Sequence, residues 1–101
     1  MAVRLVWSRE ALEDIEAIAR YIERDSPAYA RAVVVKIFNT ARDLKQHPYS
    51  GRVVPELACD DVRERFVYSY RVIYHASGDE VCIVAVVHGN RLLAPLLEHR
   101  D

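Results

Sequence analysis

The chemistry that this sequence could support is concentrated in two neighbouring segments. Residues 70–74 read Tyr-Arg-Val-Ile-Tyr, and residues 81–88 form a β-branched run that ends on His88 and continues into a Gly-Asn-Arg tripeptide. Alternation of side chains predicts two strands joined by a short turn. Arg71 could pair through its guanidinium with a carboxylate or a phosphate. His88 could act as a catalyst or form a structural hydrogen bond, and both roles are open at this point.

Charge and composition narrow the class of function. The 101 residues carry 14 basic and 15 acidic side chains, so the chain lacks the overall attraction to nucleic acid of a strongly basic domain. Cys59 and Cys82 form no CxxC pair, and no spacing suits a metal, so we expect no metal, no cofactor and no disulfide. No apolar stretch approaches the ~18 residues of a membrane span, so we expect a cytoplasmic protein without a membrane partner.

A helical hairpin is predicted after a short first strand. Alternation indicates a strand at residues 3–7, and Ser8 is a suitable N-cap for a helix over residues 9–24. Residues 25–27 interrupt this pattern and start a second helix to about residue 45, because serine caps helices and proline is tolerated at the first helical position. The apolar stripes of the two helices should be buried, with Leu12, Ile15, Ile22, Val34, Ile37 and Leu44 as their main members.

The second half of the chain is predicted to be a sheet. Turn-forming residues at 47–51 end the hairpin, and residues 52–61 show little periodicity, so we expect an exposed connection there. The alternating segments that follow predict an antiparallel meander of three strands, at residues 62–67, 70–75 and 81–88. The predicted fold is one α+β domain over residues 1–101, with the first strand and the helical hairpin packed on an antiparallel sheet.

Short motifs along nearly the whole chain carry a family resemblance through their order and spacing. They are Val6-Trp7-Ser8, Leu44, His47-Pro48, Gly51-Arg52, Pro55-Glu56-Leu57, Arg63-Glu64, Tyr70-Arg71-Val72-Ile73-Tyr74 and His88-Gly89-Asn90-Arg91. In this arrangement the chain resembles the RelE/ParE superfamily of type II toxin–antitoxin toxins.

The resemblance implies one of two activities. ParE-like members act on DNA gyrase by binding it, whereas RelE-like members enter the ribosomal A site and cut mRNA. In a RelE-like toxin, Glu56 would match the base for the ribose 2′-OH, Arg71 the phosphate clamp and His88 the acid. Unlike in that subgroup, no tyrosine follows His88. The slightly negative net charge also provides no positive field that would attract the chain to the ribosome. The resemblance therefore favours the ParE-like branch, in which the chain has no chemical step of its own.

The resemblance also implies partners. A cognate antitoxin, ParD-like or RelB-like, is expected to neutralise the toxin in a hetero-oligomer, with its C-terminal segment over the helical hairpin or the sheet edge. The target would be DNA gyrase or, alternatively, the ribosome with its mRNA. Candidate residues for contact with the antitoxin or the target are Arg63, Arg65, Arg91, Leu92, Leu93, Leu96 and Leu97.

Plainer roles for the same residues are open as well. Glu56 could form an ion pair with a nearby arginine such as Arg52. Three arginines of the meander could form a cross-strand ladder with acids of the sheet and of the antitoxin, namely Arg63, Arg65 and Arg71 with Glu64 and Glu80. A third possibility is a non-toxic module of the same fold that only pairs with a partner protein.

Overall fold

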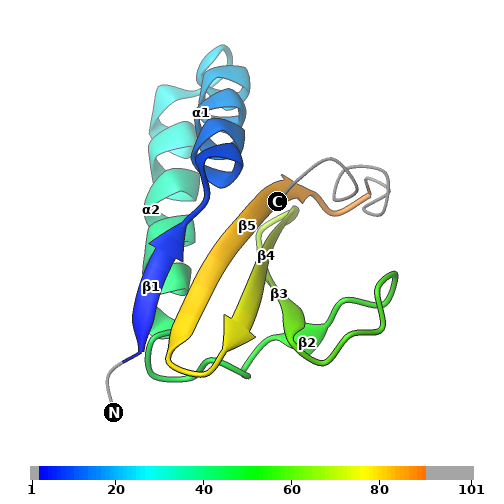
Figure 1. Cartoon of the computed structure of the whole chain (residues 1–101). Coiled ribbons are helices and arrows are strands. Elements are labelled where there is room, and N and C mark those ends of the chain that lie inside the picture. Colours follow the sequence, from blue (N-terminus) through cyan, green and yellow to red (C-terminus); the bar gives the residue numbers. More distant parts are fainter. Residues whose placement is uncertain (1–2, 91–101) are drawn as a thin grey trace.

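The computed structural model describes residues 3–90, which form a five-stranded sheet with two helices against one face (Figure 1). In chain order the elements are β1 (Arg4–Trp7), α1 (Arg9–Glu23), α2 (Pro27–Asp43), β2 (Arg52–Val53), β3 (Val62–Val67), β4 (Tyr70–Ser77) and β5 (Glu80–His88). The predicted α+β class, the helical hairpin and the three-strand meander are confirmed. Within this part of the chain, neither helix is long and apolar enough to cross a membrane.

The sheet is mixed, whereas an antiparallel one was expected. Its strand order is β1-β5-β4-β3-β2, and β1 pairs with β5 in parallel, from Arg4 opposite Glu80 to Trp7 opposite Ile83. All other pairs are antiparallel. The parallel pair arises because the chain crosses from β1 through the helices and three further strands before β5 returns beside it, and such a crossover places strands in the same direction.

The connection after the hairpin is also more ordered than expected. It contains β2, which pairs with β3 through Arg52 opposite Glu64 and Val53 opposite Arg63. Val54, directly after β2, is fully buried. A strand of two residues is too short to produce a periodic pattern, so the expectation of an exposed connection over residues 52–61 was wrong at its start.

Both helices begin as the sequence predicts. The Ser8 hydroxyl accepts a hydrogen bond from the Ala11 N–H at 3.0 Å, and the Ser26 hydroxyl accepts one from the Tyr29 N–H at 3.1 Å. These caps satisfy backbone donors that the first helical turn leaves free. Pro27 occupies the start of α2, where it removes no helical hydrogen bond.

The buried stripe of α1 differs from the expected one at its first member. Ile15, Ile22, Ile37 and Leu44 are buried as predicted, and Val34 is half-buried. Leu12, in contrast, is 45% exposed, while Ala11 is fully buried. The small Ala11 lets α1 approach the sheet closely, so that the Asp14 carboxylate reaches the Val86 N–H of β5 at 2.9 Å. A larger side chain at position 11 would hold the helix away from the strand.

The opposite face of the sheet, here called the open face, has a second small core. It consists of Val54, Ile73, Ala85 and Val87, with Leu57 and Val62 packed against it. Successive residues of β4 alternate between this cluster and the main core beneath the helices. The segment that follows β2 therefore covers part of the open face and positions Glu56 there.

Candidate functional site

Arg71 and His88 lie on opposite faces of the sheet. Tyr70 is directly opposite His88 in the β4–β5 pair, and their rings meet edge to face with centroids 5.7 Å apart. Tyr70 and His88 therefore point to the same side, which is the helix-covered side because Tyr70 packs against the main core. Arg71 follows Tyr70 along β4 and points to the open face. The three predicted catalytic residues are thus not brought together, since Glu56 joins Arg71 and His88 does not.

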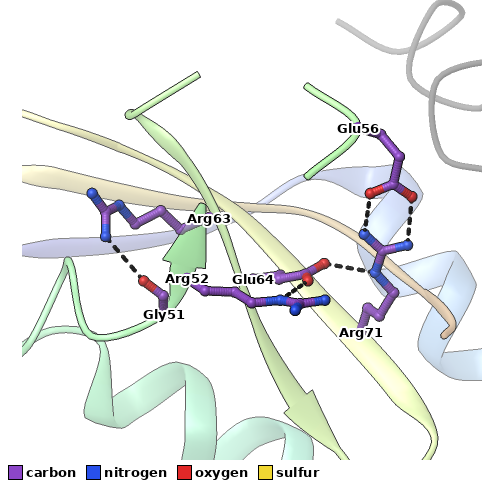
Figure 2. A network of polar contacts seen from close by, with 6 residues as sticks. All are labelled: Gly51, Arg52, Glu56, Arg63, Glu64 and Arg71. Atoms are coloured by element: carbon purple, nitrogen blue, oxygen red, sulfur yellow. Dashed lines mark hydrogen bonds and ion pairs between the residues drawn. The ribbon is translucent and has the colours of Figure 1, made fainter. Parts of the chain in front are cut away.

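On the open face, four charged side chains form one network (Figure 2). Arg71 donates from Nη1 and Nη2 to the two carboxylate oxygens of Glu56, at 2.8 and 2.7 Å. Its Nε donates to Oε1 of Glu64 at 2.6 Å, and the other oxygen of Glu64 accepts from Nε of Arg52 at 2.5 Å. Two carboxylates and two guanidinium groups balance one another, and the fork of Arg71 meets Glu56 in the bidentate geometry that arginine favours.

The centre of this network is removed from water. The Glu64 side chain is 0% exposed and that of Arg71 is 4% exposed, whereas Arg52 at the rim is 59% exposed. Charged groups are buried at this level only when they are paired and hydrogen-bonded. The guanidinium of Arg52 also lies over the Phe66 ring, 5.3 Å from its centroid, which packs the outer end of the network.

The electrostatics of the network fix the protonation states of Glu56 and Arg71. The hydrogen bonds from Arg71 lower the pKa of Glu56 from 4.5 to about 2, against the opposing effect of burial. The same bonds raise the pKa of Arg71 above its usual value. A carboxylate with so low a pKa is a weak general base. Glu56 occupies the bidentate position on the Arg71 guanidinium, so a phosphate could take that position only after Glu56 had moved.

Arg63 and Arg65 hold segments of the chain in place, so of the cross-strand ladder considered for the meander only the Arg71–Glu64 pair forms in the described residues. Arg63 donates to the carbonyl oxygens of Tyr49, Gly51 and Asp60, and it lies over the Tyr49 ring. Figure 2 shows its bond to Gly51 beside the charged network. The alternating faces of β3 direct these arginines away from Glu64.

Arg65 connects β3 to the end of α2. Its Nη1 donates to Asp43 at 2.9 Å and to the Ser50 hydroxyl at 3.2 Å. The hydrogen bond from Arg65 lowers the pKa of Asp43. Glu80, the other acid considered as a partner, pairs with Arg4 across the parallel β1–β5 edge at 2.6 Å.

One further expectation, the ion pair of Glu56, has a definite outcome. Glu56 pairs with Arg71, and the alternative partner Arg52 pairs with Glu64 instead. Five of the residues expected to contact the antitoxin or the target lie outside the described part of the chain, namely Arg91, Leu92, Leu93, Leu96 and Leu97. Between residues 3 and 90 no group of His, Cys, Asp or Glu side chains is arranged to hold a metal ion.

Sequence reasoning considered Glu64 only as an acid of the cross-strand ladder and missed its central place in this network. Glu64 joins Arg71 to Arg52 and is the most deeply buried acid of the network. The signal was an acid that alternates with Val62 and Phe66 on one strand face. With Val67 opposite Tyr70, the two-residue turn fixes the register that brings Glu64 near Arg71.

Comparisons with known proteins show what the sequence is similar to. Residues 5–93 match the family model described as the ParE toxin of the type II toxin–antitoxin system parDE. The chain is 33% identical over 90 residues to Toxin RelE2 of Caulobacter vibrioides, an alignment that covers 88% of this chain and 98% of that protein. It is 32% identical over 93 residues to putative toxin Y4kP of Sinorhizobium fredii, covering 87% and 90%.

Solved structures share the fold at lower identity. A chain of the chromosomal ParDE system from P. aeruginosa superposes with a TM-score of 0.70 and 23% identity, covering 86% of this chain and 96% of that one. The YoeB dimer from Staphylococcus aureus gives a TM-score of 0.60 and 13% identity, with coverage of 87% and 98%. At these identities the likeness concerns the fold alone.

Proposed function

Because the chain belongs to the ParE toxin family of type II toxin–antitoxin systems, we propose that it arrests growth by binding DNA gyrase, without a chemical step of its own. Its partner in this proposal is a ParD-like antitoxin that neutralises it within a hetero-oligomer. The gyrase target follows from the resemblance to the ParE-like branch, and the geometry of the sheet adds an independent argument.

That argument is the separation of the residues that RNA cleavage would need. A ribonuclease of the RelE-like kind requires a base, an acid and a cation around one scissile phosphate, within hydrogen-bond reach of the reacting atoms. Here Glu56 and Arg71 are joined to each other on the open face, while His88 lies beside Tyr70 on the other face. This arrangement supports a toxin that acts by binding its target and not by cleaving RNA.

Overall charge supports the same proposal. A protein that binds the ribosome gains from a positive field, whereas this chain has a formal net charge of −1. Of the arginines on β3 and β4, Arg63, Arg65 and Arg71 each bind a carbonyl or a carboxylate of the chain itself. Because carboxylates compensate Arg65 and Arg71, these two add little net positive charge to the surface, whereas Arg63 donates only to carbonyl oxygens and keeps its charge.

The test compares the two targets with one preparation of toxin. Purified chain is added to DNA gyrase with relaxed plasmid, and in parallel to translating ribosomes on a defined mRNA. We expect supercoiling to fall with toxin concentration, the mRNA to stay intact, and added antitoxin to restore supercoiling. Cleavage of ribosome-bound mRNA with unchanged supercoiling would establish the RelE-like alternative. A chain that is inactive in both assays and harmless when expressed alone would be the non-toxic binding module.

A further inference from the structure

Four of the six tyrosines gather where the β3–β4 turn meets the tip of the helical hairpin. Tyr29 in the first turn of α2 and Tyr68 in the β3–β4 turn pack edge to face, with ring centroids 5.6 Å apart. Tyr70 begins β4, and the pKa of its hydroxyl is raised by burial and, to a smaller extent, by the neighbouring Tyr29 and Tyr21. We call Tyr21, Tyr29, Tyr68 and Tyr70 the tyrosine cluster.

Much of the tyrosine cluster faces water. Tyr21, Tyr29 and Tyr68 are 69%, 45% and 55% exposed, whereas Tyr70 is half-buried against the main core. Exposed aromatic residues that occur singly need no explanation, but a group of them marks an interaction site. Tyrosine offers a large and rigid contact area with few torsions to order on binding, and it is therefore common at the centres of protein interfaces.

The backbone at Tyr68 gives a second, independent sign of function. Tyr68 occupies the two-residue turn between β3 and β4 with a φ of 53°, a conformation that favours glycine or asparagine and is strained for an aromatic residue. The turn is held firmly, because the Ser69 carbonyl accepts a hydrogen bond from the Gly89 N–H at 2.7 Å. Strain that is kept at an exposed aromatic residue points to a role for its side chain.

The tyrosine cluster also adjoins the segment that is expected to contact the target. Tyr70 lies opposite His88 at the end of β5, and Gly89 is bonded to the β3–β4 turn. The described chain ends at Asn90, so residues 91–101, which include five candidate contact residues, begin beside the cluster. A target that reaches this segment would therefore pass close to the tyrosines.

The charges around the cluster favour a protein over a nucleic acid as its partner. Single-stranded nucleic acid stacks on aromatic rings only where a groove of cations follows its backbone. Here the neighbouring α1 carries five acidic and two basic residues. One cation, Arg31, lines the same hollow of about 380 Å³ as Tyr68, and no acid lines this hollow. Within residues 3–90, Arg31 forms no hydrogen bond or ion pair with another residue.

We propose that the tyrosine cluster is the surface through which the chain binds DNA gyrase, in contact with an apolar patch of the gyrase protein that carries an acid. This inference rests on the proposed function, which supplies gyrase as the target. An apolar side chain of gyrase would lie against the Tyr29–Tyr68 pair, and the carboxylate would pair with Arg31. The rings would contribute contact area, and the ion pair would fix the orientation.

The experiment measures the Kd of the full-length toxin for gyrase and its inhibition of supercoiling. Tyr68→Gly removes the ring and relieves the positive φ, so the melting temperature should stay at or above that of wild type while the Kd rises about tenfold or more. Tyr29→Ala and Arg31→Glu should weaken binding in the same direction. The matched control is Tyr49→Ala, which removes a tyrosine of similar exposure (52%) outside the cluster and should leave the Kd within twofold.

Several results would overturn the proposal. Folded Tyr68→Gly and Tyr29→Ala with a Kd within twofold of wild type would place the gyrase contact elsewhere and leave the proposed function intact. A wild-type chain that neither binds nor inhibits gyrase would overturn both. A melting temperature of Tyr68→Gly lowered by more than ~5 °C would assign the ring to the stability of the fold.

Two other occupants of the cluster have their own signatures, and either would also overturn the proposal. Binding of the wild-type chain to plasmid DNA without gyrase, lost in Tyr68→Gly, would assign the cluster to nucleic acid. A toxin that dimerises alone, and becomes monomeric with Tyr68→Gly, would assign it to a second copy of the chain. Fluorescence anisotropy with labelled DNA and analytical ultracentrifugation provide these two measurements.

Discussion

Glu64 and Arg71, seven residues apart in the chain, form an ion pair that is nearly closed to water, with 2.6 Å between Oε1 and Nε. The two-residue turn between β3 and β4 sets the register that makes the pair possible. Arg71 then extends beyond Glu64 to Glu56, so the pair joins the sheet to the segment that covers its open face. Fold stability and the position of that segment are therefore coupled through one buried carboxylate.

Removal of that carboxylate should destabilise the protein strongly. Glu64→Ala leaves part of the Arg71 charge uncompensated in a buried position and frees Arg52, so we expect a loss of ~3 kcal/mol in the free energy of unfolding. Urea denaturation at pH 7 measures this loss. The matched control is Glu16→Ala, which breaks the exposed Glu16–Arg20 pair of α1 and should cost less than ~0.5 kcal/mol. Equal effects of the two substitutions would contradict the central role of Glu64.

The low pKa of Glu56 predicts a pH dependence of stability. Because its pKa is about 2 in the folded state and 4.5 as its ordinary value, the carboxylate stabilises the fold fully above pH ~5. This contribution is lost as the pH falls from 4.5 towards 2. The side chain is 32% exposed, so after solvent screening we expect a contribution of ~1–2 kcal/mol.

Comparison with Glu56→Gln isolates this effect. The variant should be less stable than wild type at pH 7, and the difference in the free energy of unfolding should shrink between pH 4.5 and pH 2.5. Chemical denaturation at a series of pH values provides the measurement. A difference that stays constant over this range would mean that the Glu56–Arg71 bond contributes no pH-dependent stability.

His88 should be dispensable for the toxic activity. Its Nδ1 accepts a hydrogen bond from the Asn90 N–H at 3.3 Å, and its exposed ring contacts Tyr70. Glutamine keeps an acceptor near this position, so His88→Gln should inhibit gyrase with a half-maximal concentration within about twofold of wild type. Loss of a catalytic acid would instead reduce a reaction rate by ~100-fold or more. A drop of that size in growth arrest or in mRNA cleavage would favour the enzymatic alternative.

Gly51 should resist substitution because its neighbours leave no room. An added Cβ would lie 2.5 Å from the backbone oxygen of Glu64 and 2.7 Å from the Tyr74 hydroxyl. That hydroxyl also accepts the Gly51 N–H at 3.0 Å, so relief of the clash would disturb a buried hydrogen bond. We expect Gly51→Ala to cost ~2–3 kcal/mol in thermal or urea unfolding.

A glycine elsewhere in the chain gives the control for Gly51. Gly78 has a φ of 58° and nothing within 4 Å of an added Cβ. Asparagine tolerates this backbone conformation, so Gly78→Asn should cost less than ~1 kcal/mol. If Gly51→Ala proved as mild as Gly78→Asn, the close approach of β2 and β3 would not be rigid.

The elements of this fold could be predicted because each has a clear local signal. Ser8 and Ser26 begin the helices, and alternation marks β3, β4 and β5 within about two residues of their observed ends. Leu12 was misplaced because a helical stripe read from sequence can be rotated by one position. The preference for Ala11 comes from how closely α1 packs on β5, which is a tertiary property.

The candidate site could be predicted only in part, for a related reason. Arg71 and Glu56 were identified, but their mutual pairing depends on how the segment after β2 folds over the sheet. The separation of His88 from Arg71 follows from strand register, because a shift of one residue in the β4–β5 pairing would place both on one face. Single-sequence patterns give the faces of each strand and do not give the register between strands.

The parallel pairing of β1 with β5 has a consequence during translation. Arg4 to Trp7 find their sheet partners only at Glu80 to Ile83, so the edge of the sheet cannot close until nearly the whole described chain has left the ribosome. At ~5–20 residues per second, the nascent chain spends several seconds without this contact. The β1 edge of the sheet is therefore completed only after the helical hairpin and the strands β2 to β4 have emerged, so the first residues of the fold to be made are among the last to reach their place.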